Sequence, residues 1–149
     1  MQLSQINIFP VKSLDGYSPD SAIVEKRGLQ HDRRWLITEP DGMFMTQRTN
    51  GKMTLLKAVI EGDFLKIFEK TNPENAVKIG LDTEGSHRRV KIWDDDVLAS
   101  QTTDEADEFL SDFLGKSCQL MKMNVENDRR VDEKYNLGED IVRDRKSVV

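Results

Sequence analysis

A β-hairpin is predicted by the stretch Arg34-Trp35-Leu36-Ile37-Thr38-Glu39-Pro40-Asp41-Gly42-Met43-Phe44-Met45-Thr46. Its first half is rich in the aromatic and β-branched side chains that strands favour. Pro40 presets φ and Gly42 accepts a positive φ, so the chain turns there and returns through residues 43–46. Because successive side chains of a strand alternate between its faces, we expect Trp35 and Ile37 to share one face.

Short β-rich runs separated by turn residues surround this hairpin. Further strands are expected at residues 6–8, 22–25, 53–61, 64–68, 77–81, 88–93 and 118–123, with a hairpin-type turn at Asn50-Gly51 and a loop at residues 71–75. This spacing is typical of a closed or sandwiched antiparallel sheet. The sequence therefore predicts a mainly β fold, an antiparallel β-barrel.

One amphipathic helix is expected near residues 103–114. Thr102 is a suitable N-cap with Glu105 three residues later, and Gly115 is a suitable end. Between them the apolar side chains recur at helical spacing, at Ala106, Phe109, Leu110, Phe113 and Leu114. We expect this stripe to pack on the barrel.

The chain of 149 residues has the size of one domain, but its composition changes near residue 124. Half of the positions from there to the end are charged, so we expect a barrel domain at residues 1–123 and a charged linker at residues 124–149. The last residues, Val148-Val149, look like the start of a further strand. We therefore expect this chain to belong to a longer protein.

The charge balance argues against two classes of partner. The formal net charge is −5, so the chain lacks a general positive field for nucleic acid or anionic lipid. No run approaches the roughly 20 apolar residues of a membrane span, and the first residues do not resemble an export signal. With a single cysteine, Cys118, no intrachain disulfide can form. We expect a cytoplasmic protein that binds neither nucleic acid nor membrane.

The stretch Phe9-Pro10-Val11-Lys12-Ser13-Leu14-Asp15-Gly16 places a cation beside a hydroxyl where a predicted strand ends. An ammonium next to a neutral donor on a turn is one way to hold a phosphate, although the several glycines of a phosphate loop are missing. The alternative is a solvated lysine in a turn, which is the commoner state of lysine. Lys12 and Ser13 are candidate anion ligands.

Two arginines are further candidates. Arg33 precedes the strand of Trp35, and strict alternation would place it on the same face, at the inward side of the barrel rim. A guanidinium there suits a carboxylate or a phosphate. Arg48 follows the return of the hairpin and would reach the same rim. The alternative is that Asp32 and its neighbouring arginines form surface ion pairs of little energetic consequence.

Other polar residues receive structural interpretations. His31 and His87 lack the further ligands of a metal site, and His31 is expected to be a hydrogen-bonding residue rather than a general base. The aspartates at residues 94–96 lack the spacing of a calcium loop and indicate a turn. Cys118 is expected to be a buried, small apolar residue. No catalytic residue and no metal ligand are assigned within this chain.

Four motifs occur in order along the sequence. They are residues 8–13, Arg27-Gly28-Leu29, Asp32-Arg33-Arg34-Trp35, and Asp41-Gly42 followed by Thr46-Gln47-Arg48. Together they resemble the N-terminal β-barrel domain of MOSC (molybdenum cofactor sulfurase C-terminal) proteins, over residues 1 to about 123. The resemblance is closest to the bacterial YcbX-like proteins and to the mitochondrial amidoxime-reducing component.

This resemblance implies an oxidoreductase that reduces N-hydroxylated compounds with a molybdopterin-type molybdenum cofactor. It implies that Lys12, Ser13 and Arg33 contact the cofactor, with Arg48 a weaker addition. The family's molybdenum-ligating cysteine belongs to a downstream MOSC domain, so Cys118 is not given that role. The chain is therefore expected to be inactive alone and to retain no cofactor tightly. Position 34 departs from the family pattern, because some relatives carry an aromatic residue there.

Partners are also implied by the resemblance. They are the downstream MOSC domain and, in many bacterial members, a 2Fe-2S ferredoxin domain or a redox protein. A pyridoxal phosphate (PLP) ligand, sometimes proposed for the wider family, stays open. The alternative function is a non-catalytic module that docks a sulfur carrier or redox partner through the barrel surface.

Overall fold

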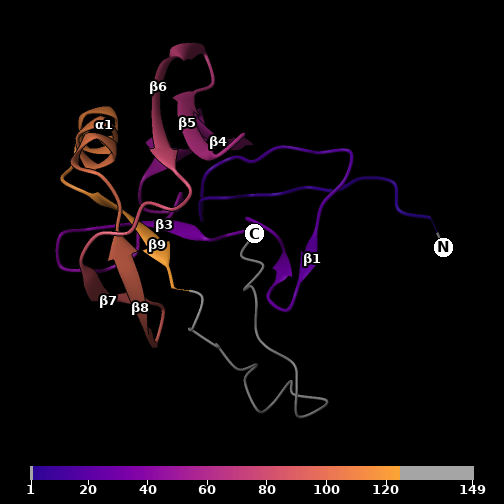
Figure 1. The fold of residues 1–149 in the computed structure, drawn as a ribbon. Helices are drawn as coiled ribbons and strands as arrows, with labels where there is room; N and C mark the ends of the chain where they lie inside the picture. The colour runs from indigo at the N-terminus through magenta and orange to yellow at the C-terminus, as the bar shows by residue number, and fades with distance from the viewer. Residues whose placement is uncertain (1, 125–149) are drawn as a thin grey trace.

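A computed structural model describes residues 2–124, and Figure 1 shows the chain as a ribbon. The predicted linker lies outside the described residues apart from Asn124, and so does the strand expected at the end of the chain. Within residues 2–124 the fold is mainly β with one α-helix, as the sequence predicts.

The regular elements are short strands, interrupted by a 3-10 helix and the α-helix. The strands are β1 (Val24–Glu25), β2 (Gly28–Leu29), β3 (Trp35–Thr38), β4 (Leu56–Glu61), β5 (Phe64–Glu69), β6 (Asn72–Gly80), β7 (His87–Ile92), β8 (Asp95–Gln101) and β9 (Gln119–Met123). The helices are η1 (Gly51–Leu55) and α1 (Asp104–Leu114). The strand pairings are antiparallel.

These strands form three separate sheets in the described part of the chain, and the predicted closed barrel is wrong. The sheet orders are β1-β2, β3-β9-β8-β7 and β4-β5-β6. The segment after the hairpin turn lies between the two edges of the four-stranded sheet. There the N–H of Met45 donates to Ile37 on β3 (2.8 Å) and the N–H of Phe44 donates to Lys91 on β7 (3.1 Å). Because this segment makes only isolated bridges, the ring of strands stays open.

Strand β3 separates two hydrophobic cores. As predicted, Trp35 and Ile37 lie in the same core, the larger one, which also contains Leu110 of α1 and apolar residues of β4, β5 and β6. Leu36 lies in the smaller core, among apolar side chains of β7, β8 and β9. The alternation of side chains along β3 therefore assigns its neighbours to two different interiors.

Helix α1 confirms the predicted stripe but corrects its start. The N-cap is Thr103, whose hydroxyl accepts the N–H of Ala106 (3.2 Å). Thr102 instead donates its hydroxyl to the carbonyl of Leu120 in β9 (3.0 Å). Gly115 ends the helix with φ 70°, the left-handed conformation that glycine adopts at low cost.

Four other boundaries differ from the sequence prediction. The expected strand at residues 6–8 is reduced to a bridge between Ile8 and Tyr17. Asn50-Gly51 leads into η1 instead of a hairpin, so the next strand begins at Leu56. The expected loop at residues 71–75 mostly belongs to β6, and β8 begins at Asp95, within residues 94–96, where the sequence predicts a turn.

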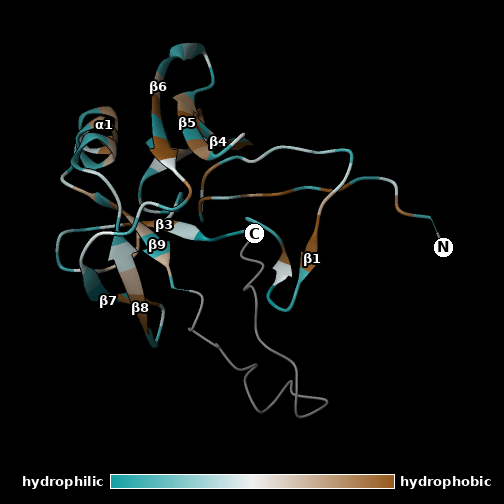
Figure 2. Cartoon of the chain, in the orientation of Figure 1, coloured by the Kyte–Doolittle hydropathy of each residue, from teal (hydrophilic) through white to brown (hydrophobic). Residues whose placement is uncertain are grey.

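The β1-β2 hairpin forms an arm on the far side of the molecule from α1 (Figure 1). Arg34 holds this arm through an ion pair with Glu25 (3.2 Å). Ile23 and Val24 are 61% and 77% exposed, and Figure 2 shows the hydrophobic colour along this edge. The arm thus presents apolar side chains to solvent.

Candidate functional site

The first and third of the four motifs lie side by side, although they are far apart in the sequence. The N–H of Arg33 donates to the carbonyl of Phe9 (2.8 Å), and the N–H of Lys12 donates to the carbonyl of Trp35 (2.8 Å). Val11 and Trp35 form a parallel bridge between these two hydrogen bonds. Residues 9–12 therefore run parallel to residues 33–35, and we call this pair of segments the motif ribbon.

Arg33 stands at the beginning of the motif ribbon. It precedes β3 and has a left-handed φ of 52°, so it is not part of the extended strand. The alternation that predicts a shared face for Arg33 and Trp35 therefore does not extend to Arg33. Its Nη1 lies 2.5 Å from Oδ2 of Asp32, and its guanidinium lies over the ring of Phe9, 5.0 Å from the centroid. The Arg33 side chain is 26% exposed, so solvent and ligands can reach it.

Asp32 is a buried carboxylate, which the sequence did not reveal. It is 5% exposed, and its second oxygen, Oδ1, accepts the N–H of Phe9 (2.9 Å). The pair of Asp32 and Arg33 is therefore not the weak surface ion pair considered as the alternative. One carboxylate ties the guanidinium to the backbone of the first motif.

Lys12 lies at the other end of the motif ribbon against two aromatic rings. Its ammonium is 4.7 Å from the centroid of Phe44 and 5.7 Å from that of Trp93, and the two rings are 4.9 Å apart. A cation over an aromatic face is attracted by the ring quadrupole. Lys12 is half-buried, so it differs from a freely solvated lysine in a turn.

Left-handed backbone gathers around these residues. Within residues 2–124, the non-glycine residues with positive φ are Ser13 (68°), His31 (67°), Arg33 (52°) and Trp93 (56°). Ser13 and Arg33 are predicted ligands, and Trp93 contacts Lys12. Such conformations cost energy in non-glycine residues and cluster at functional sites, because the surrounding structure must hold them.

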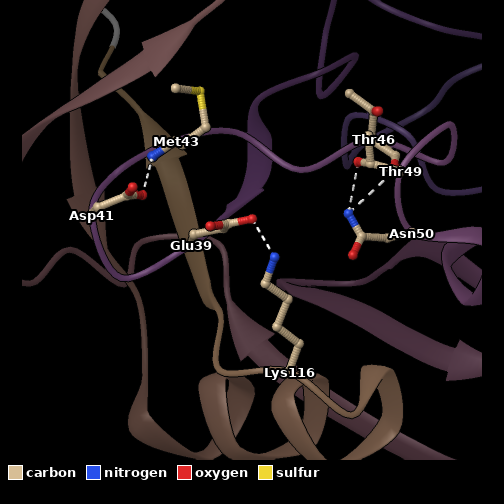
Figure 3. Close-up of polar contacts among 7 residues, drawn as sticks. All are labelled: Glu39, Asp41, Met43, Thr46, Thr49, Asn50 and Lys116. Atoms are coloured by element: carbon tan, nitrogen blue, oxygen red, sulfur yellow. Dashed lines mark hydrogen bonds and ion pairs between the residues drawn. The ribbon is translucent and has the colours of Figure 1, made fainter.

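Arg48 stands apart from the motif ribbon. The backbone pairing of the hairpin ends at Met45, and Thr46 opens a separate turn whose carbonyl accepts the N–H groups of Thr49 (3.2 Å) and Asn50 (2.9 Å). Figure 3 shows this turn beside the contact of Glu39 with Lys116. Arg48 is exposed in this turn, outside the backbone pairing that includes Lys12 and Arg33.

Two residues given structural interpretations have different outcomes. Burial lowers the pKa of His31, while Glu25 raises it and Arg34 lowers it further, and the hydrogen-bonding role expected for His31 stays a prediction. Cys118 is buried as predicted, and burial raises the pKa of its thiol above the usual range. The thiol therefore stays protonated, and Ser111 lies beside it at 3.7 Å.

Sequence reasoning missed three residues of the site. Phe44 and Trp93, which hold Lys12, come from the hairpin return and from the end of β7. No local signal joins these two rings to a lysine at position 12. The sequence indicated the role of Asp32 only weakly, because an aspartate directly before a candidate arginine can form either a surface ion pair or a buried hydrogen bond that holds the arginine.

The chain matches a known protein family. A model of the MOSC N-terminal beta barrel domain matches residues 1–117, most of the chain. The chain belongs to the MOSC N-terminal β-barrel domain family. The four ordered motifs therefore identified the family correctly, and in this chain the domain consists of three separate sheets in the described residues.

This MOSC N-terminal domain is similar to parts of much longer proteins. It is 29% identical over 144 residues to the molybdenum cofactor sulfurase of Danio rerio, covering 92% of this chain and 17% of that protein. It is 30% identical over 132 residues to the molybdenum cofactor sulfurase of Drosophila mojavensis, covering 84% of this chain. The chain thus spans about 17% of the length of these curated relatives.

A solved structure supports the fold. The solution structure of a protein from Bordetella bronchiseptica matches with a TM-score of 0.53 at 13% sequence identity, covering 71% of this chain and 90% of that one. At this identity the likeness extends to the fold alone.

The donors of the motif ribbon and of the adjacent Ser13 fit a phosphate group. Lys12, Ser13 and Arg33 supply an ammonium, a hydroxyl and a guanidinium, which are the usual partners of phosphate oxygens. No group of three or more metal-ligating side chains occurs among residues 2–124. In the same region no helix is long and apolar enough to cross a bilayer.

Proposed function

We propose that this MOSC N-terminal domain holds the terminal phosphate of a molybdopterin-type molybdenum cofactor, using Lys12, Ser13 and Arg33. The observation that carries the proposal is the motif ribbon, which joins Lys12 to the backbone of Trp35 and Arg33 to that of Phe9. Relatives named molybdenum cofactor sulfurases support the choice of this cofactor over other phosphates.

The physical basis is charge-assisted hydrogen bonding. Lys12 and Arg33 lie at opposite ends of the motif ribbon, and both carry long cationic side chains. Each hydrogen bond to a charged group contributes about 1.5–3 kcal/mol. Both cations are half-buried, so water screens them less than it screens surface lysines and arginines. Arg48 is proposed as an outer, weaker contributor.

The whole protein is proposed to be a cytoplasmic reductase of N-hydroxylated compounds, in which this domain is inactive alone. Molybdenum and its pterin supply the electron transfer when they are bound. The metal-ligating cysteine belongs to the proposed downstream MOSC domain, and a 2Fe-2S domain or redox protein supplies electrons. This chain's residues bind and orient the phosphate end.

A second candidate follows from the relatives found. Two molybdenum cofactor sulfurases are similar to this chain over most of its length, so the bound cofactor is then a substrate rather than a resident group. The phosphate contact is the same in both cases. Activity of the complete protein towards an N-hydroxylated compound distinguishes the two.

A non-catalytic docking module is the remaining candidate, and the exposed arm favours it. Ile23 and Val24 present apolar surface that a partner protein can cover. Under this function, Val24→Asp abolishes capture of a sulfur carrier or redox partner and leaves cofactor content unchanged. Under the cofactor function, substitutions in the motif ribbon lower the cofactor content and leave capture of a partner protein unchanged.

Cofactor content of the full-length gene product tests the main proposal. Lys12→Ala and Arg33→Ala are expected to lower bound molybdenum and pterin at least about tenfold each, because each removes one charged contact. Molybdenum is measured by elemental mass spectrometry and pterin by fluorescence after oxidation. Matched controls are Lys78→Ala on β6 and Arg89→Ala on β7, both exposed. Unchanged content in the double variant of Lys12 and Arg33 would overturn the proposal.

A further inference from the structure

We propose that Asp32 is a positioning residue: it fixes one edge of the Arg33 guanidinium so that the opposite edge faces a phosphate. This inference rests on the proposed function, because it concerns how that same phosphate site is assembled. It assigns a role to a buried acid that at first sight opposes anion binding.

Contacts on both oxygens of Asp32 support this role. Oδ2 lies 2.5 Å from Nη1 of Arg33, and Oδ1 accepts the N–H of Phe9 (2.9 Å). The carbonyl of Phe9 in turn accepts the N–H of Arg33 (2.8 Å), and the Phe9 ring lies under the guanidinium. Arg33 is therefore held through its backbone, one nitrogen and one flat face.

Burial shows that the carboxylate is a fixed element. Asp32 is 5% exposed, and a buried carboxylate is stable only while its hydrogen-bond partners remain in place. It cannot swing into solvent without breaking the contact with Phe9. The Arg33 side chain is 26% exposed, so part of it is accessible to solvent and to a ligand.

The planar shape of the guanidinium makes this arrangement useful. It carries five N–H donors in a rigid fork, so one edge can bind a carboxylate while the other binds an anion. A guanidinium fixed in advance loses less conformational entropy when the phosphate binds. Positioning by Asp32 therefore strengthens binding even though the carboxylate itself is negative.

The sign of the effect separates positioning from simple charge. If Asp32 acted only through its charge, its removal would tighten the binding of an anion, since a nearby negative charge is lost. If Asp32 positions Arg33, the same removal weakens binding. Asp32→Asn is the suitable variant, because its side-chain oxygen can still accept the N–H of Phe9.

The experiment is an NMR titration of the full 149-residue chain with phenyl phosphate, a simple phosphate monoester. Shifts of the Arg33 Nε–H and the Ser13 N–H report binding. Arg33→Ala is expected to weaken binding about tenfold and Asp32→Asn at least about threefold. In the Arg33→Ala background, Asp32→Asn is expected to cause no further weakening of phosphate binding.

Asp41→Asn is the matched control. Asp41 also accepts a backbone N–H, that of Met43 at 2.9 Å, but it lies in an exposed turn (Figure 3).

Arg33→Lys provides an independent test should Asp32→Asn fail to fold. Lysine keeps the charge but lacks the fork, so it cannot bind Asp32 with one edge and the phosphate with the other. We expect Arg33→Lys to bind phenyl phosphate nearly as weakly as Arg33→Ala. Wild-type affinity in Arg33→Lys would overturn the positioning role.

The outcomes also separate this inference from the proposed function. Binding by the wild type that Arg33→Ala weakens and Asp32→Asn leaves unchanged or tightens overturns the positioning role alone. Absence of saturable shifts at Ser13 and Arg33 in the wild type overturns the phosphate site itself, and the inference with it.

Discussion

The region around helix α1 and the motif ribbon are built differently. The first combines regular strands β4, β5 and β6 with a helix whose Leu110 is fully buried in the larger core. The second consists of short segments with isolated bridges and left-handed residues such as Ser13 and Arg33. Both regions bury apolar side chains, since Val11 and Trp35 of the motif ribbon also lie in the larger core, but the second adds specific polar contacts that hold cations in place. The difference indicates that stability and ligand binding can be perturbed separately.

The largest expected effect is in the regular region. Leu110→Ala removes a fully buried side chain, and we expect the free energy of unfolding to fall by about 3 kcal/mol. Leu98→Ala, at a position 40% exposed on β8, is expected to cost less than about 1 kcal/mol. Urea unfolding measures both. Similar losses in the two variants would show that burial does not dominate this region.

The second largest loss of stability is expected at Gly16, which contacts Ile8 beside the motif ribbon. Gly16 lies so close to Ile8 that a Cβ atom would be 2.0 Å from its carbonyl oxygen. Gly16→Ala is expected to lower the free energy of unfolding by about 2 kcal/mol, because backbone must move. Gly51→Ala, where a Cβ would meet nothing within 4 Å, serves as the control and is expected to change stability little. Equal stability of the two variants in urea would contradict the tight packing of Gly16 against Ile8.

Ser13 offers a test of backbone strain. At an ordinary position alanine is more stabilising than glycine, but at φ 68° glycine avoids a steric cost of about 1 kcal/mol. We expect Ser13→Gly to be more stable than Ser13→Ala in thermal or urea unfolding. At Glu108, exposed in α1, the order is expected to be the usual one, with alanine the more stable. The same order at both positions would show that the two regions do not differ in strain.

The smallest effect is the pH dependence due to His31. Burial lowers the pKa of His31 in the folded protein, so the unfolded chain binds a proton more readily. Its contribution to stability is therefore complete above about pH 7 and is lost as the pH falls below about 6.5. His31→Asn, which tolerates a left-handed φ, is expected to flatten the dependence of unfolding free energy between pH 7 and 5. Comparison at pH 8, where the histidine is neutral in both states, controls for other effects of the substitution; an unchanged slope would contradict this prediction.

Much of the regular region was predictable because its signals are local. The stripe of α1, its end at Gly115 and the strands around the Gly62-Asp63 turn follow from apolar periodicity and turn residues. The N-cap was misplaced by one residue, because Thr102 and Thr103 are equally good caps locally. Only the contact of Thr102 with Leu120, a residue of another element, separates them.

The prediction of a closed barrel was wrong for a related reason. The sequence predicts the hairpin return after Gly42, but not that the return divides its hydrogen bonds between β3 and β7. A local pattern gives the length and faces of a strand, while its neighbours depend on pairings across the whole chain. The missing strand β8 shows the same limit, since its acidic start resembles a turn when it is viewed alone.

Residue types and their order were enough to identify the family, the alternation at Trp35 and Ile37, and the cations that suit an anion. The family followed from the resemblance of the ordered motifs and the alternation from the local pattern of β3, whereas the role of these cations as phosphate ligands stays a prediction. The burial of Asp32, its hold on Arg33 and the rings around Lys12 required the folded chain. Each joins atoms from segments that become neighbours only through long-range packing, which leaves no periodic trace in the sequence.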